Sequence, residues 1–444
     1  MKGRMDMVSG PLLGKILAVA LPLAATSILQ QLFNSADFAV VGRYVGSEAL
    51  AAVGSNGPII NIIINLFVGM SVGGNVVVAT LIGQGKEDEL SDAVHTIMAV
   101  AVAGGVALIF AGIFLSRLIL SWISTPDDVM PLATEYLRIF FCGMPFSTFY
   151  NFGSAILRSK GDTKRPLAAL IVSGIVNVAL NMLLVVVFKM GVAGVALATV
   201  AAQAVSATMV CFFMMGEKGA MKFSFRRLSF RKKHLLWMMR VGLPSGVQGM
   251  VFSFSNICIQ SAINTFGSQA MAGSAAALNY EYYTFFVTSA FSQTAVTFTS
   301  QNYGAREFGR CRRVAFLCLV CGTFLTAVEA VAFSVFREFF MGVYTDDPVA
   351  LDYAVRRTMC VEFFEYMPGI YEIPAGCMRA LGVSMLPSVI VLIGSCFLRL
   401  LWIRFVFPSN RSWELLLSIY PLTWVITIAA MGIAFFVVMR RRLR

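Results

Sequence analysis

Acidic side chains inside long apolar segments are the groups of this sequence best suited to chemistry. Asp37 lies within the apolar run 12–41, shortly after Asn34 and Ser35. An ionisable side chain at the centre of a lipid bilayer costs about 2.5–3.5 kcal/mol or more unless it faces water or a partner, so such residues usually have a function. We interpret Asp37 as the leading candidate for binding a proton or a cation. The alternative is a helix-interior aspartate that a neighbouring side chain satisfies.

Three uncharged oxygen donors could join Asp37. Asn177 and Asn181 are four residues apart, which places them on one face of a helix, and Thr199 stands in the next apolar segment. Carboxylate, amide and hydroxyl oxygens together suit a hard cation such as Na⁺. The same side chains could instead form a hydrogen-bonded shell around a protonatable Asp37. In a third interpretation the two asparagines only make packing hydrogen bonds between helices.

The second half of the sequence also carries acids within apolar segments. Glu281 stands among tyrosines, and Glu362, Glu365 and Glu372 follow one another within 347–377. Spacings of three and seven residues predict that the last three acids share one face of a continuous helix. On that face they would line a cavity that accepts cations. The alternative for Glu362 is a position near the outer membrane interface, where water solvates it.

The residues that we expect to line a substrate cavity combine these acids with nearby polar groups. The candidates are Glu281, Glu365, Glu372, Tyr366 and Asn34. Glu329 and Arg399 are further charges within apolar segments, and we interpret Arg399 as part of a structural ion pair. The many Met and Phe residues, 24 and 37, would suit large apolar cations through adaptable packing and cation–π attraction.

Membrane-spanning helices must position these residues. Of the 444 residues 58% are hydrophobic and only 13% are charged, whereas a soluble protein carries about 25% charged residues. About 20 apolar residues cross a bilayer as a helix. The sequence predicts twelve spans, near 12–41, 48–82, 92–116, 130–157, 165–188, 192–215, 234–263, 269–301, 310–336, 347–377, 384–407 and 413–439. The predicted fold is therefore an all-α integral membrane protein.

A repeated pattern divides the chain into two similar halves. Leu157–Gly161 returns as Met378–Gly382, and Leu21-Pro22 returns as Leu243-Pro244. With six spans in each half, both halves enter the membrane from the same side, so a pseudo-two-fold axis along the membrane normal should relate them. We expect a six-helix lobe over 1–215, a basic linker over 216–233 and a second six-helix lobe over 234–444. The repeat places Cys258 or Ile259 opposite Asp37, so the scaffold itself does not require an acid there.

The distribution of Lys and Arg predicts the orientation of the protein. These residues collect at 158–165, 218–233, 306–313 and 440–444, which are all on one side of the predicted spans. Positive loops face the cytoplasm. We therefore expect a multi-pass protein of the cell membrane with both termini in the cytoplasm and the linker along the cytoplasmic face of the membrane.

The sequence contains no enzyme or nucleotide-binding signature. HExxH and P-loop motifs are absent, so we expect a protein that is not an enzyme, has no cofactor and does not use ATP itself. The net charge of +12 resides in short loops rather than in a basic and aromatic stripe, which argues against nucleic-acid binding. The energy for any transport must then come from a gradient of Na⁺ or H⁺.

The sequence resembles the multidrug and toxic compound extrusion (MATE) family of cation antiporters along nearly its whole length. The landmarks are Leu21-Pro22, Asp37 to Gly42-Arg43, Leu157-Arg158 through Gly161-Asp162-Thr163 to Pro166, Gly191–Gly194 through Ala198-Thr199, and Thr297–Ala305. The similarity is greatest to the bacterial and archaeal branch with DNA-damage-inducible F-like members. It implies two lobes that form a V and alternate between outward-facing and inward-facing states. It also implies export of organic cations or amphipathic drugs in exchange for Na⁺ or H⁺.

The resemblance also implies a site in the first lobe. In that branch the site consists of an Asp, an Asn, a second Asp and a Thr, and these positions fall on Asp37, Asn177, Asn181 and Thr199. Because Asn181 replaces the second Asp, a Na⁺ site would be weaker and proton coupling through Asp37 would be easier. The acid that another branch carries on helix seven has no counterpart here, and we infer that Glu281 takes that role in the second lobe.

We therefore predict a secondary-active antiporter, a monomer in the lipid bilayer, with Asp37 as the main coupling acid. Three alternative functions would make different demands on the sequence. A flippase for lipid-linked glycans or lipids shares this architecture but would favour a broad basic cavity, whereas the acids here lie inside the spans. A passive channel would need pore-loop signals, and an intramembrane enzyme would need a catalytic dyad or a metal cluster, and the sequence displays neither.

Overall fold

A computed structural model describes residues 5–122 and 125–443, apart from the side chains of residues 47 and 50. Every one of the twelve predicted spans is helical, and the described residues contain no β-strand, which confirms the all-α membrane fold. Eight of the helices are long and apolar enough to cross a bilayer by length and composition. The other predicted spans are more polar or are interrupted.

Two compact units make up the protein, and each is described by itself. Unit 1 contains residues 25–239 together with residues 5–6, and unit 2 contains residues 7–24 and 240–443. Two helices, α1 (Leu13–Tyr44) and α8 (Lys232–Asn264), contribute residues to both units.

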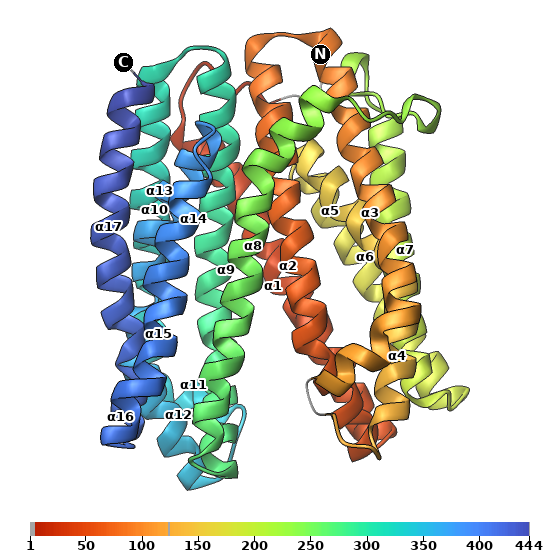
Figure 1. Ribbon diagram of the computed structural model, residues 1–444, viewed down its shortest axis with the longest axis vertical. Helices are drawn as coiled ribbons and strands as arrows, with labels where there is room; N and C mark the ends of the chain where they lie inside the picture. Colours follow the sequence, from red (N-terminus) through yellow and green to blue (C-terminus); the bar gives the residue numbers. More distant parts are fainter. Residues whose placement is uncertain (1–4, 123–124, 444) are drawn as a thin grey trace. The chain divides into compact units, whose positions relative to one another are not determined.

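Unit 1 is built around the helices that follow α1. They are α2 (Ser47–Gln84), α3 (Glu87–Trp122), α4 (Met130–Cys142), α5 (Met144–Ser159), α6 (Lys164–Asn181) with the π-helical turn η1 (Met182–Val187), and α7 (Gly191–Met215). Figure 1 labels these helices, and α3 packs against both α4 and α5. One apolar cluster of unit 1 includes Val41, Tyr136, Val185 and Val195, so it joins α1, α4, η1 and α7.

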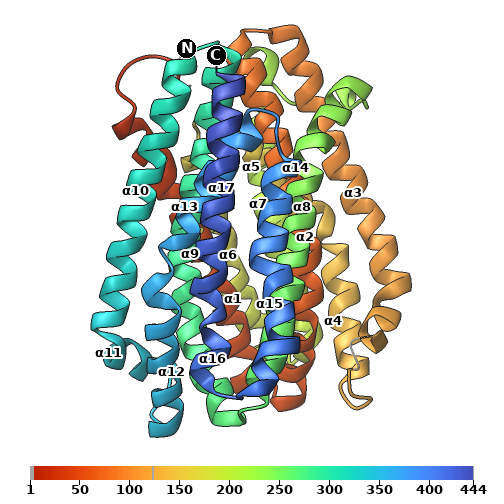
Figure 2. The ribbon, with the colours of Figure 1, turned by 60° about the vertical axis from the view of Figure 1, so that its left-hand side comes forward.

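Unit 2 contains the remaining helices. They are α9 (Ser268–Gly304), α10 (Phe308–Val335), α11 (Arg337–Gly342), α12 (Pro348–Cys360), the 3-10 turn η4 (Glu362–Phe364), α13 (Met367–Ala380), α14 (Met385–Val391), η5 (Leu392–Phe397), α15 (Leu398–Leu401), η6 (Trp402–Val406), η7 (Phe407–Ser409), α16 (Trp413–Leu417) and α17 (Ile419–Arg442). Helix α13 packs against α9, α10 and α17, and the last two lie on either side of it (Figure 2).

Corresponding helices of the two halves are interrupted in the same place. Helix α4 ends at Cys142 and α5 begins with Pro145 in its first turn. In the second half α12 ends at Cys360, and α13 begins with Pro368 in its first turn. Proline lacks a backbone N–H, so it fits the first turn of a helix, where the N–H has no partner, and it does not fit the interior.

The basic segment between the last helix of unit 1 and α8 docks onto unit 1. It contains the short turns η2 (Gly219–Met221) and η3 (Phe225–Arg227). Phe223 is buried and stacks on His95, with ring centroids 5.8 Å apart, and the backbone N–H of Ser224 donates to Nε2 of His95 at 3.1 Å. Lys160 and Arg165 both donate to Glu217. This segment is therefore held by buried contacts as well as by charge.

Candidate ion-coupling site

Four polar side chains that the sequence analysis selected meet in unit 1. Asn181 donates through Nδ2 to Oδ1 of Asp37 at 2.5 Å, and Thr199 donates through Oγ1 to Oδ2 of Asp37 at 3.4 Å. The same Nδ2 of Asn181 also donates to Oδ1 of Asn177 at 3.4 Å, and the side chain of Asn177 is a further hydrogen-bond partner of Asp37. The structure thus brings together one carboxylate, two amides and a hydroxyl from α1, α6 and α7.

Local helix geometry places these groups. Asn177 and Asn181 lie one turn apart at the end of α6, where the π-helical turn η1 begins directly after Asn181. Glycine at position 174 lets the ring of Phe33 on α1 lie directly against α6, because a side-chain carbon there would overlap that ring. Thr199 is oriented by its second hydrogen bond, from Oγ1 to the carbonyl of Val195 at 3.0 Å.

The site is buried and carries a single charge. Asp37 is 9% exposed and Asn181 is 1% exposed. Hydrogen bonds from uncharged side chains surround the Asp37 carboxylate, and none of the basic side chains in the described residues pairs with it. The surrounding apolar cluster includes Val41 and Val195, and the phenol of Tyr136 is close enough to interact electrostatically with Asp37. A carboxylate in such a place either takes up a proton or binds a cation.

One atom at the site is left without a partner. Oδ1 of Asn181 is buried and accepts no hydrogen bond from any described residue. A buried acceptor normally has a donor or a cation, because leaving it unpaired costs about 1–3 kcal/mol. The donor set of carboxylate, amide and hydroxyl oxygens fits a hard monovalent cation, and the free acceptor fits either that cation or an O–H group.

Glu281 does not present a free carboxylate. Arg357 on α12 donates to it from Nε at 2.6 Å and from Nη2 at 2.8 Å, and both side chains are buried. Arg357 also donates to Ser274 at 2.8 Å and lies over the ring of Tyr420. This bidentate pair neutralises Glu281 in the present structure, so the predicted role of Glu281 in receiving a cation would require the pair to open.

The three acids of the tenth predicted span do not share one continuous helix, and that prediction is wrong. Because α12 ends before Glu362 and α13 begins at Met367, the chain turns between Glu362 and Glu372. The alternative of a solvated position for Glu362 is also wrong, since Glu362 is fully buried and accepts from Oγ1 of Thr284 at 2.7 Å. Glu365 is buried as well.

The remaining cavity candidates occupy separate surroundings. Glu372 accepts from Gln248 at 3.0 Å and lies 3.5 Å from Arg379, and Gln248 in turn accepts from Arg379 at 2.8 Å. Tyr366 is half-buried at the start of α13, and Asn34 is exposed on α1. Within unit 2, Glu365 lies close enough to Glu281 and Glu362 to interact with them electrostatically, whereas Glu372 makes its contacts with Gln248 and Arg379.

Two arginines of unit 2, Arg399 and Arg357, have partners that were not expected from the sequence. The predicted ion pair of Arg399 is wrong: none of the ion pairs among the described residues includes it, and its guanidinium carbon lies 4.4 Å from the ring centroid of Tyr420. Arg399 is held by this cation–π contact and by a hydrogen bond to Thr423 at 3.3 Å. Arg357 was not selected at all, although an arginine in a span opposite a glutamate in another span was the signal that could have identified it.

Comparisons with known proteins agree on one family. The MatE family model matches residues 22–183 and 244–402, once in each half of the chain. The probable multidrug resistance protein YpnP of Bacillus subtilis is 28% identical over 89% of this chain and 88% of its own length. YoeA of the same organism, also a probable multidrug resistance protein, is 27% identical over 83% of this chain and 81% of its own length.

A solved structure shares the fold. A MOP superfamily transporter from Pyrococcus furiosus superimposes with a TM-score of 0.89 at 18% identity, covering 99% of both chains. That structure was described as having a binding pocket of reversed polarity that suggests a different function. At this level of identity the likeness establishes the architecture alone.

Proposed function

Because the chain belongs to the MatE family of membrane transporters, we propose that it is a secondary-active efflux antiporter that exports organic cations or amphipathic drugs across the cell membrane in exchange for H⁺ or Na⁺. Members of this family are transporters and not enzymes. The relatives named as probable multidrug resistance proteins support the substrate class. The single observation that carries the coupling role is the buried Asp37 carboxylate, which has uncharged hydrogen-bond partners and no basic partner among the described residues.

The Asn181 amide allows the site to hold two states of Asp37. With Asp37 ionised, Nδ2 of Asn181 donates to the carboxylate and Oδ1 of Asn181 has no partner. When Asp37 takes up a proton, it becomes a donor, and a half turn of the Asn181 amide brings Oδ1 to accept from it. The same half turn would present Oδ1 to a bound Na⁺. Oδ1 of Asn181 thus lacks a partner in the unloaded site and gains one when Asp37 is protonated or Na⁺ binds.

Exchange requires that loading change the affinity of the protein for its cargo. A ligand that binds two states equally well shifts no equilibrium between them. Ionised Asp37 adds a negative charge to unit 1, and protonation or Na⁺ removes it, so a cationic substrate would be held more strongly in one state than in the other. Proton or Na⁺ entry would then release the substrate.

Replacing Asp37 with Asn tests this role. In proteoliposomes with either a proton or a Na⁺ gradient imposed separately, we expect Asp37→Asn to lose gradient-driven export of a cationic dye by at least about tenfold, because the variant can neither lose a proton nor pair with a cation. Glu48→Gln makes the same chemical change at an exposed position and should export at the wild-type rate. Wild-type export by Asp37→Asn would overturn the coupling role, and the gradient that drives the wild type identifies the coupling ion.

Three predictions from the sequence remain proposals alongside this one. We infer that both termini face the cytoplasm, on the support of the Lys and Arg residues at 158–165, 218–233 and 440–444. Membership of the DNA-damage-inducible F-like branch and a monomeric state rest on the sequence resemblance.

A further inference from the structure

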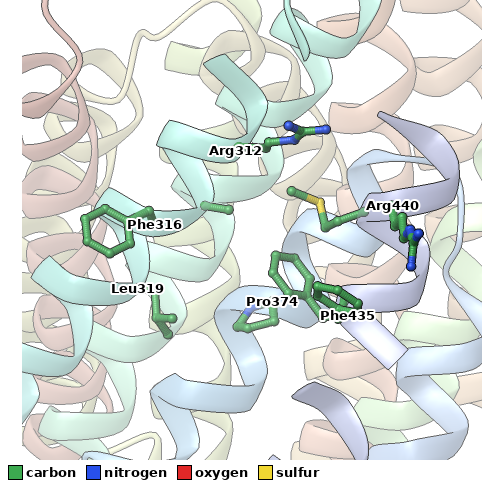
Figure 3. A pocket seen from close by; sticks show the side chains of 9 residues that line it. Arg312, Phe316, Leu319, Pro374, Phe435 and Arg440 are labelled. Carbon is green, nitrogen blue, oxygen red and sulfur yellow. The ribbon is translucent and has the colours of Figure 1, made fainter. Parts of the chain in front are cut away.

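An apolar groove with an arginine pair at one end lies on unit 2, among α10, α13 and α17. Its volume of about 470 Å³ falls within the roughly 300–1,000 Å³ of small-ligand pockets. Figure 3 shows Arg312 and Arg440 in the upper part of the view, with Leu319, Pro374 and Phe435 below them.

The two helices that form the sides of the groove, α10 and α17, each carry an arginine near the same end of the groove and a phenylalanine one turn away from it. Arg312, Phe316 and Leu319 are spaced four and three residues apart, so they follow one face of α10, and Leu319 lies about 10 Å further along the helix axis than Arg312. On α17, Phe436 precedes Arg440 by one turn. Arg312 is near the start of α10 and Arg440 is near the end of α17, so both charges stand at one end and the apolar side chains continue away from it.

Arg312 and Arg440 give the groove a positively charged end. Arg312 donates from Nη2 to the carbonyl of Leu443 at 2.9 Å, and a carbonyl leaves the positive charge in place. None of the ion pairs formed within residues 5–122 and 125–443 includes Arg312 or Arg440. The arginines therefore remain available for an anion, which a guanidinium binds with paired N–H groups.

The apolar part of the groove opens to the exterior of the helix bundle. Phe316 is 65% exposed and Phe436 is 66% exposed. In a protein that spans a membrane, side chains of this kind at the outside of a helix meet lipid acyl chains. Pro374 forms part of the floor, so whatever fills the groove packs on α13 where its hydrogen-bond ladder is interrupted.

We propose that this groove binds one anionic phospholipid, with its phosphate between Arg312 and Arg440 and an acyl chain along Phe316, Leu319 and Phe435. Charge and shape both select this occupant. The paired arginines complement a phosphate at the membrane surface, where basic residues attract anionic headgroups. The adjoining apolar groove covers a chain that a free phosphate ion does not have.

Lipid retention by the purified protein in detergent tests this proposal. The probes are dioleoyl phosphatidylglycerol, which is anionic, and dioleoyl phosphatidylcholine, which has no net charge, and native mass spectrometry counts the bound lipids. Each arginine near an anionic headgroup contributes roughly a factor of five in affinity, so we expect the double variant Arg312→Gln/Arg440→Gln to lose its preference for phosphatidylglycerol by about 25-fold. The wild type should retain one phosphatidylglycerol.

A matched control keeps the total charge equal. Arg313→Gln/Arg441→Gln removes two neighbouring arginines that do not line the groove, and it should retain the lipid as the wild type does. Dihexanoyl phosphatidylglycerol, which has the same headgroup on short chains, should bind at least tenfold more weakly than the dioleoyl lipid. Three outcomes would overturn the proposal. The two double variants could lose phosphatidylglycerol equally, the short-chain lipid could bind as tightly as the dioleoyl lipid, or the spectrum could show a dimer of the protein in place of a lipid adduct.

Discussion

A single amide nitrogen holds the Asp37 carboxylate at short range, and this contact explains why residue 181 matters for ion choice. Asn181 is the closest partner of Asp37 and is itself almost fully buried. An amide can offer a donor to an ionised acid and an acceptor to a protonated acid or a cation. A second acid at this position could offer only oxygens to Asp37 while both groups are ionised.

Replacing Asn181 with Asp should therefore make the protein dependent on Na⁺. Two carboxylates at about 2.5 Å cannot both ionise without a cation between them. We expect Asn181→Asp to gain thermal stability when NaCl replaces choline chloride, by several degrees more than the wild type gains. Asn264→Asp, an exposed asparagine of α8, serves as the control. An equal response to Na⁺ in all three proteins would contradict this interpretation.

The buried pair of Glu281 and Arg357 should contribute much more to stability than its exposed neighbours. Removing one partner leaves an uncompensated buried charge, so Arg357→Ala should lower the free energy of unfolding in detergent by about 3–5 kcal/mol. The adjacent Arg356 pairs with Asp352 and Glu414 at the surface, where water screens the charges, so Arg356→Ala should change the free energy of unfolding far less than Arg357→Ala does. Glu281→Met/Arg357→Met should recover part of the loss, since it leaves no unpaired charge. Similar losses in the two alanine variants would refute the structural role.

The sequence was most informative about residues within one helix, because helix periodicity determines which side chains share a face. Asn177 and Asn181 had to share a face because they are one turn apart, so the spacing alone predicted this part of the cluster. The meeting of these two residues with Asp37 and Thr199 was implied by the family resemblance. The partners of Arg399 and Glu281 come from segments far apart in the chain. Side-chain shape decides which spans pack against each other. Residue spacing within one segment does not reveal these contacts between segments.

At the scale of the elements, glycine and proline decide where helices stop and how closely they pack. The break before Pro145 and the break before Pro368 occur at corresponding places, and sequence periodicity alone treated each span as continuous. An apolar run continues across such a break because both half-helices face lipid or core. Hydrophobicity therefore predicts the span but not its interruption.

Gly105 should be essential for the packing of α3 against the start of α5. A side-chain carbon at this position would lie 2.5 Å from Cα of Pro145 and 2.6 Å from Oγ1 of Thr148. Since one of these neighbours is backbone, we expect Gly105→Ala to lower the free energy of unfolding by about 1–3 kcal/mol. Gly432→Ala in α17 meets nothing within 4 Å and should be neutral or stabilising by about 0.5–1 kcal/mol. Thermal unfolding in detergent compares the two, and an unchanged midpoint for Gly105→Ala would show that α3 can shift away.

For the whole molecule, the docked basic segment predicts a dependence of stability on pH. Burial raises the pKa of Glu217, but hydrogen bonds from Lys160 and Arg165 outweigh it, so the pKa of this carboxyl lies below its ordinary value of 4.5. A lowered folded-state pKa stabilises the folded protein above the ordinary pKa, and this contribution disappears as the pH falls below about 4.5.

Unfolding measured between pH 7 and pH 3 should reveal this contribution. We expect Glu217→Gln to be less stable than the wild type at pH 7 and the difference to shrink as the solution is acidified below about pH 4.5. Glu48→Gln at an exposed site should show no such convergence. A gap that stays constant with pH would mean that Glu217 acts through packing and not through its charge.

The interruption between α12 and α13 has a mechanical consequence. A continuous α-helix transmits rotation about its axis from end to end, because each turn is bonded to the next. Between Val361 and Tyr366 that regular bonding is replaced by single 3-10 contacts, so the half that carries Arg357 can twist without turning the half that carries Arg379. The clusters around Arg357 and Arg379 lie on one span of the chain, yet no continuous helix couples their rotation.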